Sequence, residues 1–170
     1  DYCLSHGEAR IGWGDLGDLL SDQLEDTPAF QELGKNDRRS ITEFSRVIQK
    51  GDVLACIRSN SEIQAVGVVT GDYRFESTPP PGVYEGFKHV LPVRWLMQGL
   101  NLDIRELNDG SGLTLRTVYP LRRIRWPSFV EALSAHGANL SEAVLLEPSA
   151  TDGDRGDYVL IIDEINRGNV

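Results

Sequence analysis

The sequence has few of the residues that build disulfide frameworks or metal centres. It contains two cysteines and three histidines, and the histidines show no metal-ligand spacing with one another or with the cysteines. Cys56 lies inside an apolar run that is typical of a strand, and Cys3 stands close to the first residue. We therefore expect two reduced thiols in a cytoplasmic protein, and neither a disulfide framework nor a metal centre built from these histidines and cysteines.

Long apolar runs are also missing. A helix needs about 20 consecutive apolar residues to cross a membrane, and the apolar runs here are much shorter. No signal peptide is visible, so we expect no membrane partner. The chain begins at Asp1 rather than at methionine, and we expect it to be a fragment or a trimmed piece of a longer protein.

A third absence concerns nucleotide phosphates. A glycine-rich turn followed by lysine and serine or threonine surrounds such phosphates with backbone N–H groups and an ammonium. The one Gly-Lys pair in the sequence, Gly34-Lys35, is followed by Asn36, and Ala29 stands where the first glycine should be. These 170 residues by themselves should therefore not hydrolyse GTP or ATP.

The formal net charge of −9 is distributed unevenly. Residues 1–32 hold eight acids and one base, residues 33–130 ten acids and fourteen bases, and residues 131–170 eight acids and two bases. The basic middle is a candidate surface for nucleic acid phosphates, although an ordinary solvated surface has the same pattern. Its candidate phosphate contacts are Arg38, Arg39, Arg94, Arg122, Arg123 and Arg125.

Apolar spacing along the chain predicts a small α+β domain. Helical spacing is found over residues 15–25, 39–50 and 127–136. Residues 52–58 and 62–70 flank a short turn, which predicts a β-hairpin. Further strands are expected over residues 89–96 and 113–119. Short strands with early helices favour a curled sheet or a small barrel.

Three segments carry a resemblance to a known family. They read IGWGDLGDL at residues 11–19, GDVL followed by IQAVGVVTGDY between residues 51 and 73, and HVLPVRW at residues 89–95. In this order they resemble an EVE-like domain of the PUA superfamily, which is related to the YTH readers of methylated adenine. The resemblance covers residues 1–130 and implies a small mixed β-barrel with flanking helices. It also implies that a modified base is flipped into an aromatic pocket.

Physical chemistry supports an aromatic pocket for such a ligand. A methyl group offers no hydrogen bond, so a reader must enclose it in apolar or aromatic surface. Stacking a base on an aromatic side chain gains about 1–3 kcal/mol, whereas flipping the base costs a few kcal/mol. Stacking and hydrogen bonds to the edge of the base therefore have to offset the cost of flipping.

The candidate base-binding residues follow from their positions. Trp13 lies between two glycines and matches the cage tryptophan of the YTH-type readers, although a tryptophan that staples a helix start is the alternative. Asp15 is a candidate acceptor for an exocyclic amino group, or else an N-cap. Four aromatic residues border the proline loop and either contact a base or pack on the barrel: Tyr73, Phe75, Tyr84 and Phe87.

The last thirteen residues, YVLIIDEINRGNV, carry a second resemblance. Residues 158–162 are apolar without alternation, as in a strand covered on both faces of a parallel sheet, and Asp163 and Glu164 follow at the carboxyl end of that strand. DEINRGN closely resembles the Walker B segment of the AAA+ GTPase subunit of McrB-type restriction systems. By this resemblance Asp163 would associate with Mg²⁺, Glu164 would activate water, and Asn166 and Arg167 would belong to a loop that faces the nucleotide or a neighbouring subunit.

Together the two resemblances predict a domain organisation and a function. Residues 1–130 form the reader, residues 131–157 a helix and linker, and residues 158–170 the Walker B strand of a partial AAA+ domain. The expected function is recognition of methylated or hydroxymethylated DNA bases. In the full-length protein we expect GTP and Mg²⁺, ring assembly and a McrC-type nuclease subunit. The reader is either inserted between P-loop and Walker B strands or separated from a P-loop that has been cut away.

Two alternatives to this function stay open. In the first, the chain is part of an AAA+ motor whose barrel serves assembly rather than base recognition. In the second, it is an RNA-binding PUA-like domain. We expect no cofactor for the reader domain itself.

Overall fold

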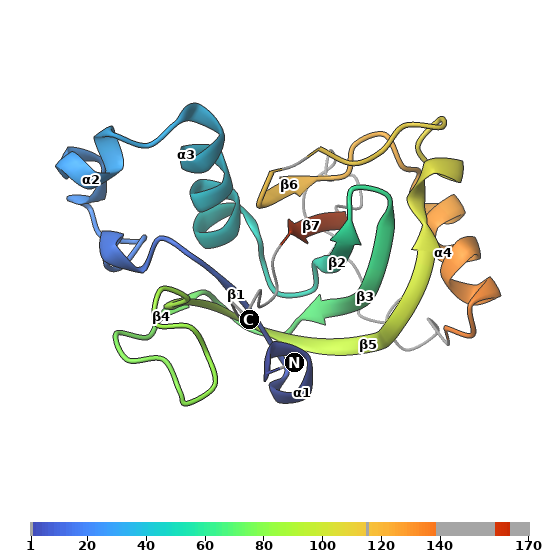
Figure 1. The fold of residues 1–170 in the computed structure, drawn as a ribbon, viewed down its shortest axis with the longest axis horizontal. Coiled ribbons are helices and arrows are strands. Elements are labelled where there is room, and N and C mark those ends of the chain that lie inside the picture. Colours follow the sequence, from blue (N-terminus) through green and yellow to red (C-terminus); the bar gives the residue numbers. More distant parts are fainter. Residues whose placement is uncertain (1, 115, 139–158, 164–170) are drawn as a thin grey trace.

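The structure is a computed structural model that describes residues 2–114 and 116–138, together with the backbone of residues 159–163. The candidate residues Glu164 and Asn166 lie outside this described part. The fold is mixed α+β, and its centre is a curled sheet that forms a half-barrel (Figure 1). The expected α+β class with a curled sheet is therefore confirmed.

The sheet has seven strands, and most of the neighbouring pairs are antiparallel. The strands along the path are β1 (Glu8–Ile11), β5 (His89–Asp103), β3 (Glu62–Val69), β2 (Val53–Ser59), β7 (Val159–Asp163) and β6 (Val118–Pro120). The two-residue strand β4 (Arg74–Phe75) pairs with the start of β5. The predicted hairpin is confirmed as β2 and β3.

Strand β5 connects β1 and β4 to the rest of the sheet. Its first residues pair with β1, and the rest of its fifteen residues pair with β3. Gly67 of β3 permits this close pairing, because an added Cβ would lie 2.6 Å from Val93 Cγ1 and 2.8 Å from Trp95 Cε3. The predicted strand over residues 89–96 is thus confirmed but continues to Asp103.

The terminal apolar run does form a strand. Strand β7 runs parallel to β2, with Val53 opposite Val159, and antiparallel to β6, with Val118 opposite Ile162. It therefore belongs to the same sheet as the rest of the chain, with one parallel neighbour rather than two. Strand β6 is shorter than the predicted strand over residues 113–119 and begins at Val118.

The predicted helix over residues 15–25 is wrong. Two short 3₁₀ turns, Gly14–Leu16 and Leu24–Asp26, occupy its place. The Asp18 carboxylate accepts the N–H of Leu20, and the hydroxyl of Ser21 accepts another backbone N–H, so side chains compete with helical hydrogen bonds. Leu20 is 46% exposed. The regular leucine spacing therefore does not produce one buried helical face.

The other helices agree with the sequence patterns more closely. Helix α3 (Lys35–Thr42) continues as a wider π turn to Val47, so it begins four residues before the predicted start. Its first turn is polar, and apolar spacing therefore does not reveal it. Helix α4 (Trp126–Ala135) confirms the third predicted helix, with proline in its first turn. Two short helices, α1 (Tyr2–His6) and α2 (Pro28–Gln31), were not predicted.

The interior is divided into two cores on either side of the curved sheet. The first core joins the start of β5 and strand β1 to α3, and Phe44 and Leu91 are completely buried in it. The second core lies where α4 packs on the far half of the sheet through Phe129 and Leu133. Both cysteines are buried free thiols, as expected. No helix among the described residues is long and apolar enough to span a membrane.

Candidate nucleic-acid interface

A small cavity lies between β1, the loop before β5 and the segment that enters β6. Its lining residues are Ile11, Gly12, Trp13, Phe87 and Thr117, and its volume is about 160 Å³. An engineered apolar cavity of about 150 Å³ in another protein binds benzene. The cavity therefore has room for one aromatic ring, and two of its walls are aromatic side chains.

Trp13 reaches this cavity from an uncommon backbone conformation. Its φ of 64° lies in the left-handed region, which non-glycine residues rarely adopt. The Trp13 carbonyl accepts the N–H of Leu16 at 2.9 Å, and the N–H of Gly14 donates to the Gly86 carbonyl at 3.1 Å. A Cβ at Gly14 would lie 2.7 Å from that carbonyl oxygen, so glycine is required there. The turn is thus joined directly to the loop that carries Phe87.

The side chain of His89 forms a hydrogen bond with the backbone of Trp13. His89 is fully buried, and its Nε2 lies 3.0 Å from the Trp13 carbonyl oxygen. Because a carbonyl only accepts, Nε2 must carry the proton, and Nδ1 of the neutral ring then accepts from the Tyr73 hydroxyl at 3.0 Å. Burial lowers the pKa of His89, which favours this neutral form.

Tyr73 completes this chain of hydrogen bonds. Its hydroxyl oxygen accepts the N–H of Leu19 at 3.1 Å while its proton goes to His89. Burial raises the pKa of Tyr73 to about 12, so the hydroxyl stays protonated. Every group of the chain has a partner, and the position of Trp13 is therefore determined by directional bonds.

Arg10 holds Phe87 in a corresponding way. Arg10 is 1% exposed, and its Nη1 donates to the Phe87 carbonyl at 3.0 Å. Its Nε donates to Glu8 at 2.6 Å, and its Nη2 donates to Glu76. Arg74 donates to the same two carboxylates, at 3.1 and 3.0 Å. The network balances two cations against two anions, which a buried charge requires.

The two arginines of this network also change the pKa of Glu76. Burial opposes ionisation of Glu76, but hydrogen bonds from Arg10 and Arg74 outweigh it and lower the pKa of that carboxyl. Glu76 therefore stays ionised at neutral pH. Two buried side chains therefore hold the cavity aromatics. His89 donates to the Trp13 carbonyl, and Arg10 donates to the Phe87 carbonyl.

The structure separates the six candidate base-binding residues. Tyr84 is 56% exposed, and its ring packs edge-on against Phe87 with centroids 5.8 Å apart. Tyr73 and Phe75 lie against His89 instead, with ring centroids at 6.0 and 5.5 Å. Trp13 and Phe87 therefore line the cavity, and Tyr84 lies beside them.

Asp15 lies apart from the cavity lining. It is exposed in the 3₁₀ turn Gly14–Leu16, and the residue in the N-cap position of that turn is Trp13. Neither an N-cap role for Asp15 nor a place in the described cavity wall follows from this geometry.

Several residues around the cavity were not proposed from the sequence as parts of a binding site. Thr117 lies about a hundred positions after Trp13, and no local pattern marks it. The sequence could have indicated Arg10, because it is the one base beside the eight acids of residues 1–32 and therefore a candidate for ion pairing. His89 is buried, and its two ring nitrogens are both hydrogen-bonded.

The six candidate phosphate contacts lie on different elements. Arg38 and Arg39 belong to α3 and line a second depression. Arg122, Arg123 and Arg125 are exposed between β6 and α4, and Arg94 is exposed on β5. The six are therefore distributed over α3, β5 and the segment between β6 and α4.

The one Gly-Lys pair of the sequence does not form a phosphate-binding loop in the structure. Gly34 is the extended N-cap of α3 and Lys35 its first residue, so no glycine-rich loop surrounds a phosphate there. Asp163 ends β7 beside Ile57 of β2. Among residues 2–114 and 116–138, no group of three or more histidine, cysteine, aspartate or glutamate side chains could hold a metal ion.

Comparison with known proteins identifies a family but no relative of known structure. A family model described as a domain of unknown function (DUF8426) matches residues 1–122. The chain belongs to this family. The matched range contains every residue that lines the cavity. Neither the curated proteins nor the solved structures gave a match.

Proposed function

We propose that this domain recognises a modified DNA base that is flipped into the cavity between Trp13 and Phe87. One observation carries the proposal: two aromatic side chains from distant parts of the chain line a cavity of about 160 Å³, and buried hydrogen bonds hold both of their carbonyls. Aromatic walls and Ile11 suit a methyl group, and the Thr117 hydroxyl offers a donor and an acceptor for the edge of the base.

The size of the cavity favours a base with one ring. A cavity of about 150 Å³ accepts benzene, and a purine adds a second ring to that volume. Methylated or hydroxymethylated cytosine is therefore the favoured ligand. The energy balance is also suitable, because stacking at about 1–3 kcal/mol per aromatic side chain offsets a flipping cost of a few kcal/mol.

The wider proposal is that this reader, an EVE-like domain, serves a McrB-type restriction GTPase. Its support is the DEINRGN sequence that begins at Asp163, the last residue of β7. GTP and Mg²⁺ would bind only in the full-length protein, which would assemble into AAA+ rings and work with a McrC-type nuclease subunit. If so, Glu164→Gln in that protein abolishes GTP turnover, whereas unchanged turnover refutes this part of the proposal.

The reader itself is tested by titration. Duplex DNA with one central 5-methylcytosine, 5-hydroxymethylcytosine, N6-methyladenine or unmodified base, and RNA of the same sequence, is titrated with the wild type and with Trp13→Ala. We expect tighter binding to a modified cytosine duplex and loss of that preference in the variant. Equal binding to all duplexes would refute the reader, and preference for RNA would favour the PUA-like alternative.

Two further variants sharpen this test. Gly12→Ala narrows the cavity by one methyl group at ordinary contact distance from Phe87, since a Cβ at residue 12 lies 3.8 Å from Phe87 Cε1. We expect it to reduce binding of the modified base. Trp126→Ala is the matched control, because it removes the same side chain from the second core. Its preference for modified DNA should equal that of the wild type.

A further inference from the structure

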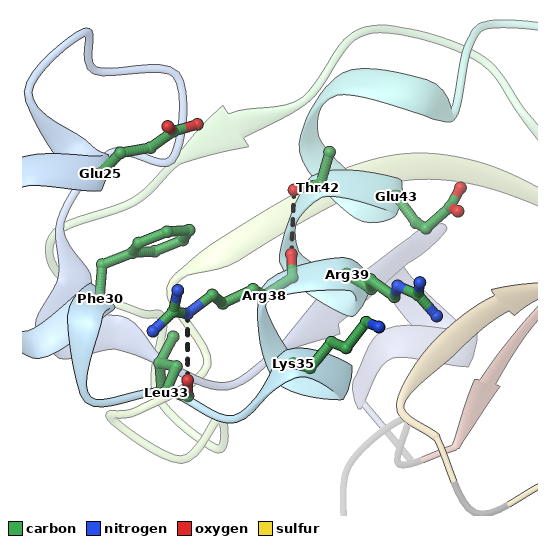
Figure 2. A pocket seen from close by; sticks show the side chains of 8 residues that line it. All are labelled: Glu25, Phe30, Leu33, Lys35, Arg38, Arg39, Thr42 and Glu43. Carbon is green, nitrogen blue, oxygen red and sulfur yellow. Dashed lines mark hydrogen bonds between the residues drawn. The ribbon is translucent and has the colours of Figure 1, made fainter.

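A second and wider depression lies between α2 and α3 (Figure 2). Its volume is about 600 Å³. Its lining contains three cations and two anions, and the complete set is Glu25, Phe30, Leu33, Lys35, Arg38, Arg39, Thr42 and Glu43. Three cations in five consecutive residues are notable in a chain whose net charge is −9.

The three cations have different roles. Arg38 extends toward Phe30 and Leu33, with its guanidinium carbon 5.5 Å from the centre of the Phe30 ring and its Nε donating to the Leu33 carbonyl at 3.0 Å. It also donates to the Gln31 carbonyl. Arg38 therefore braces the connection between α2 and α3, and part of its donor capacity is used within the protein.

Lys35 and Arg39 are available to a ligand. They are four positions apart, so they lie on one face of α3, and in Figure 2 both extend from the side opposite to Arg38. Both are exposed. Within the part of the chain that the structure describes, neither has an acidic partner within 4.0 Å, although Glu43 follows one turn after Arg39.

Helix α3 is attached to the walls of the cavity that contains Trp13. The Ser40 hydroxyl is 3.3 Å from both the N and the O of Val118, which follows the cavity residue Thr117. Arg46, in the π turn, donates to the Leu19 carbonyl at 3.3 Å, and the Leu19 N–H donates to Tyr73. Buried and half-buried hydrogen bonds therefore fix the position of α3, which carries Lys35 and Arg39, relative to the cavity.

We propose that Lys35 and Arg39 bind phosphates of the DNA strand whose base enters the cavity. The inference rests on the proposed function and adds the residues that contact the backbone. Ammonium and guanidinium groups are the usual partners of phosphate oxygens, and such contacts release counterions. They position the strand without reading its sequence.

The test is the salt dependence of binding by the whole chain. Duplexes with and without 5-methylcytosine are titrated at several KCl concentrations with the wild type and with Lys35→Ala/Arg39→Ala. The slope of log K against log [KCl] should become less steep by about 1 for each residue, or about 2 in total. Affinity for both duplexes should fall by the same factor, so the preference for the modified duplex stays unchanged.

Three controls make the result specific. Glu43→Gln should strengthen binding, because it removes an anion from the same face of α3. Arg58→Ala, at the β2–β3 hairpin, removes an exposed arginine elsewhere and should leave the slope unchanged. Melting curves should show all variants folded. Inorganic phosphate at constant ionic strength should compete with DNA for the wild type and less for the double variant, whereas equal competition for both proteins would overturn the proposal.

The outcomes separate this inference from the proposed function. The salt slope could stay unchanged in the double variant while the preference for modified DNA still depends on Trp13. That result overturns the phosphate contacts and supports the proposed base recognition. A reduced slope without any preference for modified DNA supports the phosphate contacts and overturns the reader.

Discussion

The two cores of this domain share strand β5 but are built from different chemistry. Among the described residues, the buried polar side chains are Glu8, Arg10, Ser40, Ser45, His89 and Asn108. Five of these six lie on β1, α3, its π turn or the start of β5, around the first core, and Asn108 alone lies near the second. The second core is packed by apolar side chains of β3, β5 and α4.

This difference indicates separate tasks for the two halves. Apolar packing is non-directional and stabilises the fold in proportion to buried area. Buried hydrogen bonds add less net stability, but each one fixes the position of its partners. The second core should therefore contribute mainly stability, and the polar side of the first core should set the geometry of Trp13 and Phe87.

The largest effect is expected from Phe129→Ala. Phe129 is completely buried in the second core, so its removal should lower the free energy of unfolding by about 4 kcal/mol. Urea denaturation measures this loss, and the half-buried Val130→Ala should lose less. DNA titration of the folded variant should show an unchanged preference for modified DNA. A reduced preference would mean that the two halves are not separate.

Arg10→Met should have the next largest effect. It leaves Glu8 buried without its nearest cation and should cost about 3 kcal/mol, at the lower end of the range for broken buried ion pairs because Arg74 still pairs with Glu8. It should also weaken modified-base binding, because the Phe87 carbonyl loses its donor. In urea denaturation, Arg10→Met/Glu8→Gln should recover part of the stability. Full retention of the DNA preference in Arg10→Met would argue against a positioning role.

His89→Phe should have a moderate effect on stability. It removes one hydrogen bond from the Trp13 carbonyl and one from the Tyr73 hydroxyl, which keep the N–H groups of Leu16 and Leu19 as partners, at a cost of about 2 kcal/mol. The preference for modified DNA should fall, since Trp13 loses its support. His89→Gln offers an amide donor to the Trp13 carbonyl and should restore part of that preference. If Phe and Gln at this position bind alike, the hydrogen bond does not position Trp13.

The smallest effect is a dependence of stability on pH. Burial lowers the pKa of His89 below its ordinary value of 6.5, despite the attraction of Asp18, and Lys88 adds to the lowering. The unfolded chain therefore binds a proton first, so stability is complete above pH 6.5 and falls as the pH drops below it. Urea denaturation at pH 7.5, 6.5 and 5.5 should show this fall in the wild type.

His89→Phe is the control for that titration. It has no imidazole to protonate, so its stability should change less between pH 7.5 and 5.5 than that of the wild type. Glu76 does not affect this window, because its lowered pKa places its contribution below the ordinary carboxyl range near 4.5. Parallel curves for the two proteins would assign the pH dependence to other groups.

Local sequence patterns predicted elements where one face of a segment is regularly apolar. The hairpin of β2 and β3, the start of β5 and helix α4 follow from such patterns because their own side chains decide which face is buried. The segment 15–25 has the same kind of pattern and forms no helix. There the side chains of Asp18 and Ser21 accept hydrogen bonds from backbone N–H groups, and the chain turns.

The sequence by itself determined the α+β class, the hairpin, the free thiols and the absence of a phosphate loop, because each depends on residue types or on neighbours close along the chain. Tertiary structure decided which aromatic residues share a cavity. Trp13 and Phe87 meet because β1 pairs with β5, and Thr117 joins them because Ser40 of α3 bonds to Val118. Contacts over such separations depend on how whole elements pack, and no local pattern encodes that packing.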